Sequence, residues 1–281
     1  LDTMYDSLSD FNIYTKSTFP KIILEAAILD FTKSNTIISN SKGIDFSINK
    51  GLYGFSPMFT AKEGKNTSSF NYTGFCTQKL DRPLHQYGTI EQLLRETEQQ
   101  TKTFSIKNKF IGDLIITPDC LGDFLSIVEN YISDFMIISG RSIYKNKLNQ
   151  SIANEKLTLH SHPLSDKLDY NYFLTGDGYT SNNSTIIDKG VLKTLLLGIY
   201  GSNKTGQKRA VNDGGNHIVE PGDKSLEDII SSTKKGVLLS RFSGGSPSDN
   251  GDFSGVAKNS YYIENGKIKY PISETMISGN I

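Results

Sequence analysis

The sequence predicts an α+β fold, with mostly antiparallel strands in a barrel-like sheet or meander and a few interposed helices. Short apolar or alternating runs recur along most of the chain, and turn residues separate them. One segment, residues 119–139, instead carries apolar side chains at helical spacing. Near the end, an Asn-Gly pair at positions 265 and 266 separates two strand-like runs, which is the strongest short-range signal for a β-hairpin.

Length and charge narrow the class of protein before any motif is considered. The chain has 281 residues, 30 Lys and Arg against 30 Asp and Glu, and no basic block, which argues against nucleic-acid binding. Its apolar runs are too short to cross a bilayer and no signal peptide opens it, so we expect no membrane association. Two cysteines, Cys76 and Cys120, cannot form a disulfide framework, which favours a reducing, cytoplasmic location. Because the first residue is Leu1 rather than Met, we expect an N-terminal part to be missing.

The beginning of the chain is expected to be a linker followed by a hairpin. Residues 1–19 are polar without a clear period, which indicates a linker or the remnant of a missing N-terminal domain. Residues 22–31 are ambiguous between helix and strand on periodicity alone. Turn-like residues 33–35, followed by the apolar run 36–38, indicate a hairpin at this point.

A β-meander and a helix are expected up to residue 110. A turn at Lys42-Gly43 precedes a strand at 44–49, and residues 69–77 carry aromatic side chains that favour a strand. Thr89 and Gln92 fit a capping box for a polar, largely solvated helix that extends to about Thr101.

The second half of the chain is expected to alternate strands with two further helices. A strand at 111–117 leads into Pro118, a favourable first helical residue, and Gly140 ends the helix that follows. Ser225 and Asp228 are spaced to cap a helix that ends at Gly236. Residues 188–190 join two runs as a compact hairpin. The other strand-like runs are 156–160, 186–187, 191–197, 237–242, 253–257, 260–263 and 267–270.

Histidines are the first candidates for chemistry. A strand through residues 160–162 would place the His160 and His162 side chains on one face, as two metal ligands require, but Pro163 follows and no third ligand lies at a diagnostic spacing. We therefore favour loop or surface histidines and expect no metal in this chain. His217 closes a polar, glycine-containing run that fits either ligand contact or a self-contained loop. None of the four histidines is followed by Glu, so HExxH and HExxxH zinc motifs are absent.

The last part of the chain carries several closely spaced motifs that are similar to those of a known protein family. The runs GVLLSRFSGG (236–245), NGDFS (250–254), YIENGKI (262–268), YPISE (270–274) and SGN (278–280) resemble the C-terminal signature of the TldD/PmbA family. Upstream, and less tightly, IISNSKG (37–43), ISGRSIY (138–144) and DKGVL (188–192) are similar to further motifs of that family. The resemblance implies three parts: the linker or remnant at 1–19, a central segment at 20–110 and a C-terminal domain at 111–281.

The resemblance also implies a function. In this family a TldD-type subunit carries HExxxH on a helix, binds zinc and cleaves unfolded or leader-bearing peptides, whereas a PmbA/TldE-type subunit lacks the motif and pairs with it. The helix predicted at 119–139 occupies the place of the zinc helix and holds no histidine. The chain is therefore expected to be a non-catalytic PmbA/TldE-like subunit in a homo- or heterodimer, with zinc only in a TldD-type partner. The family's N-terminal α/β domain has no counterpart in this sequence.

Two other functions remain open at this point. An interaction or regulatory protein without a proteolytic role fits the family's older name, modulator of DNA gyrase. An autonomous hydrolase would have to use His160, His162 or His217, which the sequence disfavours.

Candidate residues for peptide or partner binding lie mainly in the C-terminal signature. Gly244 and Gly245 lack side chains and would permit close backbone approach, although a tight loop between strands explains them equally well. Arg241 is a candidate for pairing with a carboxylate across a subunit interface, Asp252 for orienting a loop, and His217 for ligand contact. We expect an extended peptide to pair with a strand edge through backbone hydrogen bonds.

Overall fold

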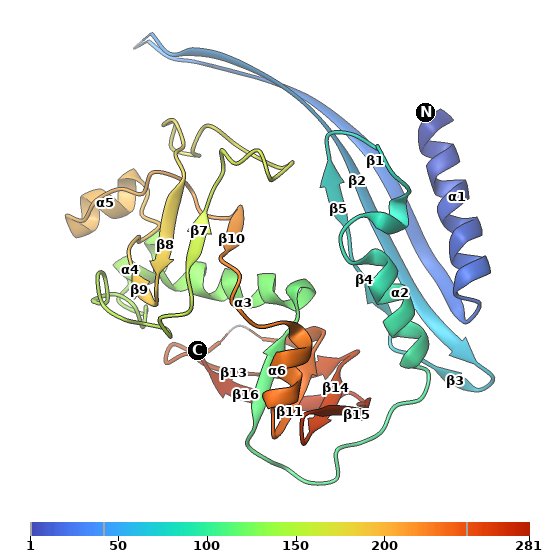
Figure 1. The fold of residues 1–281 in the computed structure, drawn as a ribbon. Helices are drawn as coiled ribbons and strands as arrows, with labels where there is room; N and C mark the ends of the chain where they lie inside the picture. Colours follow the sequence, from blue (N-terminus) through green and yellow to red (C-terminus); the bar gives the residue numbers. More distant parts are fainter. Residues whose placement is uncertain (1, 42, 246) are drawn as a thin grey trace. The chain divides into compact units, whose positions relative to one another are not determined.

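The computed structural model describes residues 2–41, 43–245 and 247–281, which form two compact units (Figure 1). The first unit comprises the chain up to Ser105 together with Tyr270–Ser273, and the second comprises Ile106–Lys269 with Glu274–Ile281. Both combine helices with mostly antiparallel strands, so the predicted α+β class is confirmed. The strands of the described residues are distributed over four sheets. No helix in the described ranges is long and apolar enough to cross a membrane.

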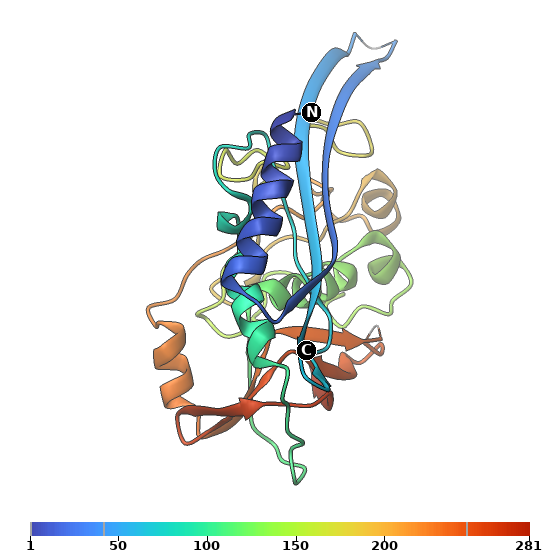
Figure 2. The ribbon, with the colours of Figure 1, turned by 90° about the vertical axis from the view of Figure 1, so that its right-hand side faces the viewer.

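The first unit is built on one long antiparallel ribbon. Strands β1 (Ile22–Ser39) and β2 (Asp45–Glu63) pair along almost their whole length, and three short strands add to β2. Helices α1 and α2 pack on the ribbon, and Figure 2 shows α1 running alongside it. The other elements are α1 (Asp2–Thr18), β3 (Asn66–Thr67), β4 (Asn71–Tyr72), β5 (Phe75–Thr77), the short helix η1 (Leu84–Gln86) and α2 (Ile90–Gln99).

Residues 1–19, expected to be a linker or the remnant of a missing N-terminal domain, contain a regular helix, α1 (Asp2–Thr18). Its Phe11 ring is buried and lies 5.0 Å from the Phe55 ring, at an edge-to-face angle of 80°. Thr15, one helical turn later, is also buried. The helix is therefore stabilised by contacts of a few side chains with the ribbon. So few apolar positions give no clear helical period in a polar sequence.

The predicted turn at residues 33–35 is wrong. Lys33, Ser34 and Asn35 continue β1 and pair with Gly51, Lys50 and Asn49. β1 ends at Ser39 and β2 begins at Asp45, and Gly43 between them has φ of +87°. Lys42 of this predicted turn lies outside the described residues. Pairing with a complementary strand outweighs the local turn preference of Lys-Ser-Asn.

Helix α2 exists as predicted but is less solvated than expected. Thr89 is its N-cap residue, yet its side chain makes no capping hydrogen bond. Ile90, Leu93, Leu94 and Thr97 are buried. These side chains recur at helical spacing and belong to the core that contains the buried aromatic residues of β2.

The second unit contains three sheets and most of the helices. The first sheet has the order β10-β7-β8-β9, the second β15-β14-β11-β6 and the third β12-β13-β16. Their strands are β6 (Asp113–Ile116), β7 (Leu159–Ser161), β8 (Ser184–Asp188), β9 (Val191–Leu192), β10 (His217–Val219), β11 (Lys235–Leu239), β12 (Arg241–Gly244), β13 (Asp252–Lys258), β14 (Tyr261–Glu264), β15 (Lys267–Pro271, whose last two residues belong to the first unit) and β16 (Thr275–Asn280). The helices are α3 (Pro118–Tyr131), α4 (Asp134–Ile138), α5 (Ile199–Thr205) and α6 (Leu226–Ser232).

Two predicted hairpin turns are confirmed by their backbone angles. Asn265 and Gly266 have φ of +50° and +72°, and Lys189 and Gly190 have φ of +45° and +78°. Positive φ at both central positions is the requirement of the tight turn that fits twisted strands. The first turn joins β14 to β15 and the second joins β8 to β9.

The helix predicted at 119–139 is divided into α3 and α4. The break lies at Ile132 and Ser133, where the Ile132 carbonyl accepts a hydrogen bond of 2.9 Å from Leu196 N–H and Ser133 adopts extended backbone angles. Pro118 does begin the first helix, and Gly140 follows the second with φ of +76°.

The capping box of α6 is confirmed, since Asp228 N–H donates to Ser225 Oγ at 3.1 Å. That helix ends at Ser232, four residues earlier than predicted.

Candidate functional site

His160 lies on β7 of the β10-β7-β8-β9 sheet, and His162 directly follows that strand. His160 Nδ1 lies 3.0 Å from Thr185 Oγ1, and its Nε2 lies 3.1 Å from Glu220 Oε1. The His162 ring is 4.8 Å from the His160 ring, centroid to centroid. Burial, with a smaller contribution from His160, lowers the pKa of His162. Both nitrogens of His160 thus have protein partners, which leaves this pair poorly suited to share a metal ion.

His217 lies on the neighbouring strand but contacts a different element. It pairs with Ser161 across β10 and β7. Its Nε2 atom lies 2.7 Å from Glu129 Oε1 of α3, a contact that becomes an ion pair only when the imidazole is protonated. Glu129 Oε1 also accepts a hydrogen bond of 2.7 Å from Gly215 N–H. The Glu129 carboxylate therefore fixes the loop before β10 to α3, and sequence reasoning did not single it out.

Arg241, Gly244 and Asp252 lie on the third sheet, apart from the histidine sheet in the topology. Asp252 pairs with Asn280, the last residue of β16. Its carboxylate accepts hydrogen bonds of 2.8 Å from Asn280 Nδ2 and 2.8 Å from Asn250 Nδ2, and these donors lower its pKa. Asn280 Nδ2 also donates to the Asn250 carbonyl at 2.9 Å. Asp252 thus joins the two ends of the signature NGDFS…SGN.

The glycines of this sheet make room for an aromatic ring. A Cβ atom on Gly244 or on its cross-strand partner Gly255 would approach the Phe242 ring to 2.5 Å. Phe242 and Phe253 lie 5.8 Å apart, and the Phe124 ring of α3 lies 5.5 and 5.6 Å from them. We call Phe124, Phe242 and Phe253 the aromatic cluster. A Cβ on Gly245, in contrast, would meet no atom within 4 Å.

Helix α3 does not offer a zinc site. Its sheet-facing side carries Phe124, and no histidine occurs in Pro118–Tyr131. Within residues 2–41, 43–245 and 247–281, no three His, Cys, Asp or Glu side chains come together as metal ligands. The residues present therefore do not fit the zinc ion that the resemblance implies for the other branch.

Cys120 is expected to resist alkylation in the folded chain, whereas Cys76 reacts. Cys120 is buried on α3, and burial raises the pKa of its thiol to about 11, whereas Cys76 is exposed. At about pH 8 the Cys120 thiol stays protonated and is a poor nucleophile. Mass spectrometry after brief treatment with iodoacetamide is expected to find the label on Cys76 alone. Unfolded chain is the control and should be labelled at both positions; rapid labelling of folded Cys120 would contradict this expectation.

Comparison with known proteins gives consistent matches. Residues 111–281 match the family model described as the PmbA/TldA metallopeptidase C-terminal domain. A metalloprotease of Methanocaldococcus jannaschii is 27% identical over 188 residues, covering 62% of this chain and 41% of the relative. Metalloprotease PmbA of Escherichia coli O157:H7 is 30% identical over 154 residues, covering 51% of this chain and 34% of the relative.

Two solved structures share the fold over nearly the whole chain. TldE from Thermococcus kodakarensis superposes with a TM-score of 0.86 at 19% identity, covering 99% of this chain and 66% of that one. A candidate modulator of DNA gyrase from Bacteroides thetaiotaomicron gives 0.80 at 24% identity, covering 97% and 64%. This chain thus spans less than two thirds of the relatives it matches. Because the family model covers more than half of the chain, including the aromatic cluster and the Asp252–Asn280 pair, the chain belongs to the PmbA/TldD metallopeptidase family.

Proposed function

We propose that this chain is a PmbA/TldE-like subunit of a TldD-type metallopeptidase complex and does not itself carry the catalytic centre. The observation that carries the proposal is the packing of α3, the helix in the place of the family's zinc helix. Phe124 fills its sheet-facing side against Phe242 and Phe253. This side of α3 is therefore packed with hydrocarbon, and the helix holds no histidine that could bind zinc.

The proposed partner is a TldD-type subunit that supplies zinc, in a cytoplasmic heterodimer. This chain would help to enclose an unfolded or leader-bearing peptide while the partner hydrolyses it. The fold shared with TldE supports the architecture of such a subunit. Each of the three sheets has an edge strand among the described residues, and addition of a strand to such an edge is how proteins recognise an extended peptide with little sequence selection.

Mixing this chain with a TldD-type subunit tests the proposal. We expect no bound zinc and no peptide cleavage for the chain alone, and cleavage of an unfolded peptide, above that of the partner alone, when both are present. A partner with both histidines of its HExxxH motif changed to alanine is the control and should remain inactive in the mixture. Stoichiometric zinc and chelator-sensitive cleavage by the chain alone would contradict the proposal. Binding to DNA gyrase, without any effect on peptide cleavage, would favour the regulatory function instead.

A further inference from the structure

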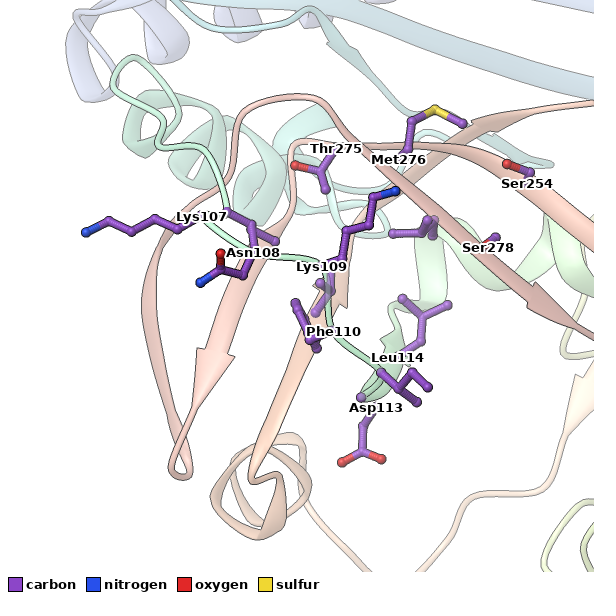
Figure 3. Close-up of a pocket in the computed structure, with 15 residues that line it drawn as sticks. Lys107, Asn108, Lys109, Phe110, Asp113, Leu114, Ser254, Thr275, Met276 and Ser278 are labelled. Carbon is purple, nitrogen blue, oxygen red and sulfur yellow. The ribbon is translucent and has the colours of Figure 1, made fainter.

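A cavity of about 600 Å³ opens in the second unit between the segment that precedes β6 and the last strand, β16 (Figure 3). Residues 106–112 line one side of it, and Met276 and Ser278 of β16 line another. Leu114 and Val237, which are neighbours across the parallel strands β6 and β11, line its inner end. Its volume is within the ordinary range of ligand-binding pockets.

The cavity lies on the face of the third sheet that is turned away from α3. Side chains alternate between the two faces of a strand, and Phe253 of β13 contacts Phe124 of α3. Ser254, the next residue of β13, and its cross-strand partner Ser278 therefore lie on the opposite face, where both line the cavity. The cavity is thus a separate feature from the aromatic cluster.

Two strands at sheet edges border the cavity. β16 ends the order β12-β13-β16, and β6 ends the order β15-β14-β11-β6, among the strands of the described residues. Each edge strand presents backbone N–H and C=O groups on the side without a neighbour. An extended chain that enters the cavity can therefore add to β16 as a further strand.

The segment 106–112 is held in place by its aromatic residue. The Phe110 ring lies 5.8 Å from the Tyr262 ring in an edge-to-face arrangement, and the Lys235 ammonium lies 4.4 Å from the Phe110 ring centroid. Gly112 passes so close to β11 that a Cβ would meet the Lys235 carbonyl oxygen at 2.5 Å. These contacts fix the side of the cavity opposite β16.

The charge in the cavity is positive. Lys109 extends from this segment toward Met276, whereas the ends of Lys107 and Asp113 point away from it (Figure 3). Within the part of the chain that the structure describes, the Lys109 ammonium makes no ion pair. An exposed ammonium at the side of the cavity can form a charge-assisted hydrogen bond with a carboxylate of the bound molecule.

We propose that this cavity binds an extended, acidic peptide segment, which pairs with the edge of β16 and places a carboxylate against Lys109. The proposal rests on the proposed function and names the substrate class for it: unfolded peptide with an acidic side chain. Apolar contacts with Met276 and Leu114 accommodate neighbouring side chains without selecting among them.

Fluorescence anisotropy with short labelled peptides tests the charge. A peptide of alternating Val and Thr with one central Glu is expected to bind the full chain, and the matched Gln peptide to bind about fivefold to tenfold more weakly. Lys109→Glu should weaken binding of the Glu peptide by about tenfold, while Lys224→Glu, an exposed change outside the cavity lining, should leave it within about twofold. Equal effects of the two substitutions, or equal binding of the Glu and Gln peptides, would overturn the proposal.

Backbone methylation of the peptide tests the pairing with β16. Methyl groups on alternate peptide nitrogens remove the donors of one edge of the added strand, so one parity should abolish binding and the other should leave it intact. Competition by succinate as complete as that by unlabelled peptide would show a small-anion site and would overturn the peptide assignment.

The outcome can be separated from that of the proposed function. If the Lys109→Glu chain still restores cleavage of an acidic peptide by the TldD-type partner, at the normal KM, peptide binding in the cavity is refuted. The proposed role as a helper subunit is then unaffected. If the chain binds peptide in a way that depends on Lys109, but no cleavage occurs on mixing with the partner, peptide binding in the cavity is supported. The proposed helper function is then refuted.

Discussion

Gly255→Ala is expected to destabilise the second unit by about 1–3 kcal/mol, the range for inserting a group into a filled site. A Cβ at this position would lie 2.5 Å from a carbon of the Phe242 ring and 2.7 Å from Gly244 Cα, so the ring has to move. Its movement breaks the 5.5 Å contact with Phe124 and loosens α3 from the sheet. Urea unfolding followed by far-UV circular dichroism measures the change, since the chain has no tryptophan to report it.

Gly245→Ala is the matched control for this experiment. Gly245 follows Gly244 in the same signature, yet a Cβ there meets nothing within 4 Å, so its stability should change by less than about 0.5 kcal/mol. Placing Gly255→Ala in a Phe242→Ala background should recover part of its cost, because the ring that it displaces is gone while the 2.7 Å approach to Gly244 Cα remains. Equal losses for Gly245→Ala and Gly255→Ala would show that the ring does not explain the glycines.

Gly201→Ala is expected to destabilise the second unit by a similar amount, about 2–3 kcal/mol. Gly201 is buried in α5, and a Cβ there would overlap the Asp134 carboxylate. That carboxylate accepts hydrogen bonds of 3.0 Å from Gly198 N–H and 3.2 Å from Gly201 N–H at the N-terminus of α5. The new methyl group displaces the carboxylate and removes both bonds. Thermal and urea unfolding of the variant provide the measurement.

A double-mutant cycle identifies Asp134 as the cause. Asp134→Ala alone should cost about 1–2 kcal/mol through the lost cap. The double variant Asp134→Ala with Gly201→Ala should cost less than the two single changes added together, by about 1 kcal/mol or more. Gly122→Ala in α3, where a Cβ meets no atom within 4 Å, is the helical control and should raise stability by about 0.5–1 kcal/mol. Strict additivity in the cycle would rule out the overlap with Asp134.

The features that sequence predicts well are those decided by a few neighbouring residues. Asn265-Gly266 adopts the positive φ angles of a tight hairpin because only such residues tolerate them, and Ser225 with Asp228 caps α6 within a single turn. Pro118 begins α3 for the same local reason. In each of these cases the residues that determine the structure are adjacent in the sequence.

The features that sequence misses depend on partners far along the chain. Phe11 makes α1 stable only because Phe55, more than forty positions later, lies against it, and the predicted turn at Ser34 becomes strand because Lys50 pairs with it. The break after α3 requires Leu196 to reach the Ile132 carbonyl. None of these contacts leaves a periodic signal in its own segment.

The contacts of the candidate residues could not be predicted from the sequence, for the same reason. Asp252, Gly244 and His217 were singled out by residue type, and the structure gives them partners in Asn280, Phe242 and Glu129. Lys109 was not singled out, because its position beside β16 arises from segments more than 150 residues apart. The residue type alone identifies candidate residues, but their contacts are known only from the tertiary structure.

Tyr270–Ser273, which belong to the first unit although they lie near the end of the chain, have a consequence for biosynthesis. Phe104 N–H donates to the Pro271 carbonyl at 2.9 Å, and Ser273 N–H donates to the Phe104 carbonyl at 3.0 Å. Translation delivers the first unit's helices and ribbon early, yet this segment emerges from the ribosome only after nearly all of the second unit. The first unit is therefore completed last, and a nascent chain that stops short of Tyr270 leaves both backbone groups of Phe104 without these partners.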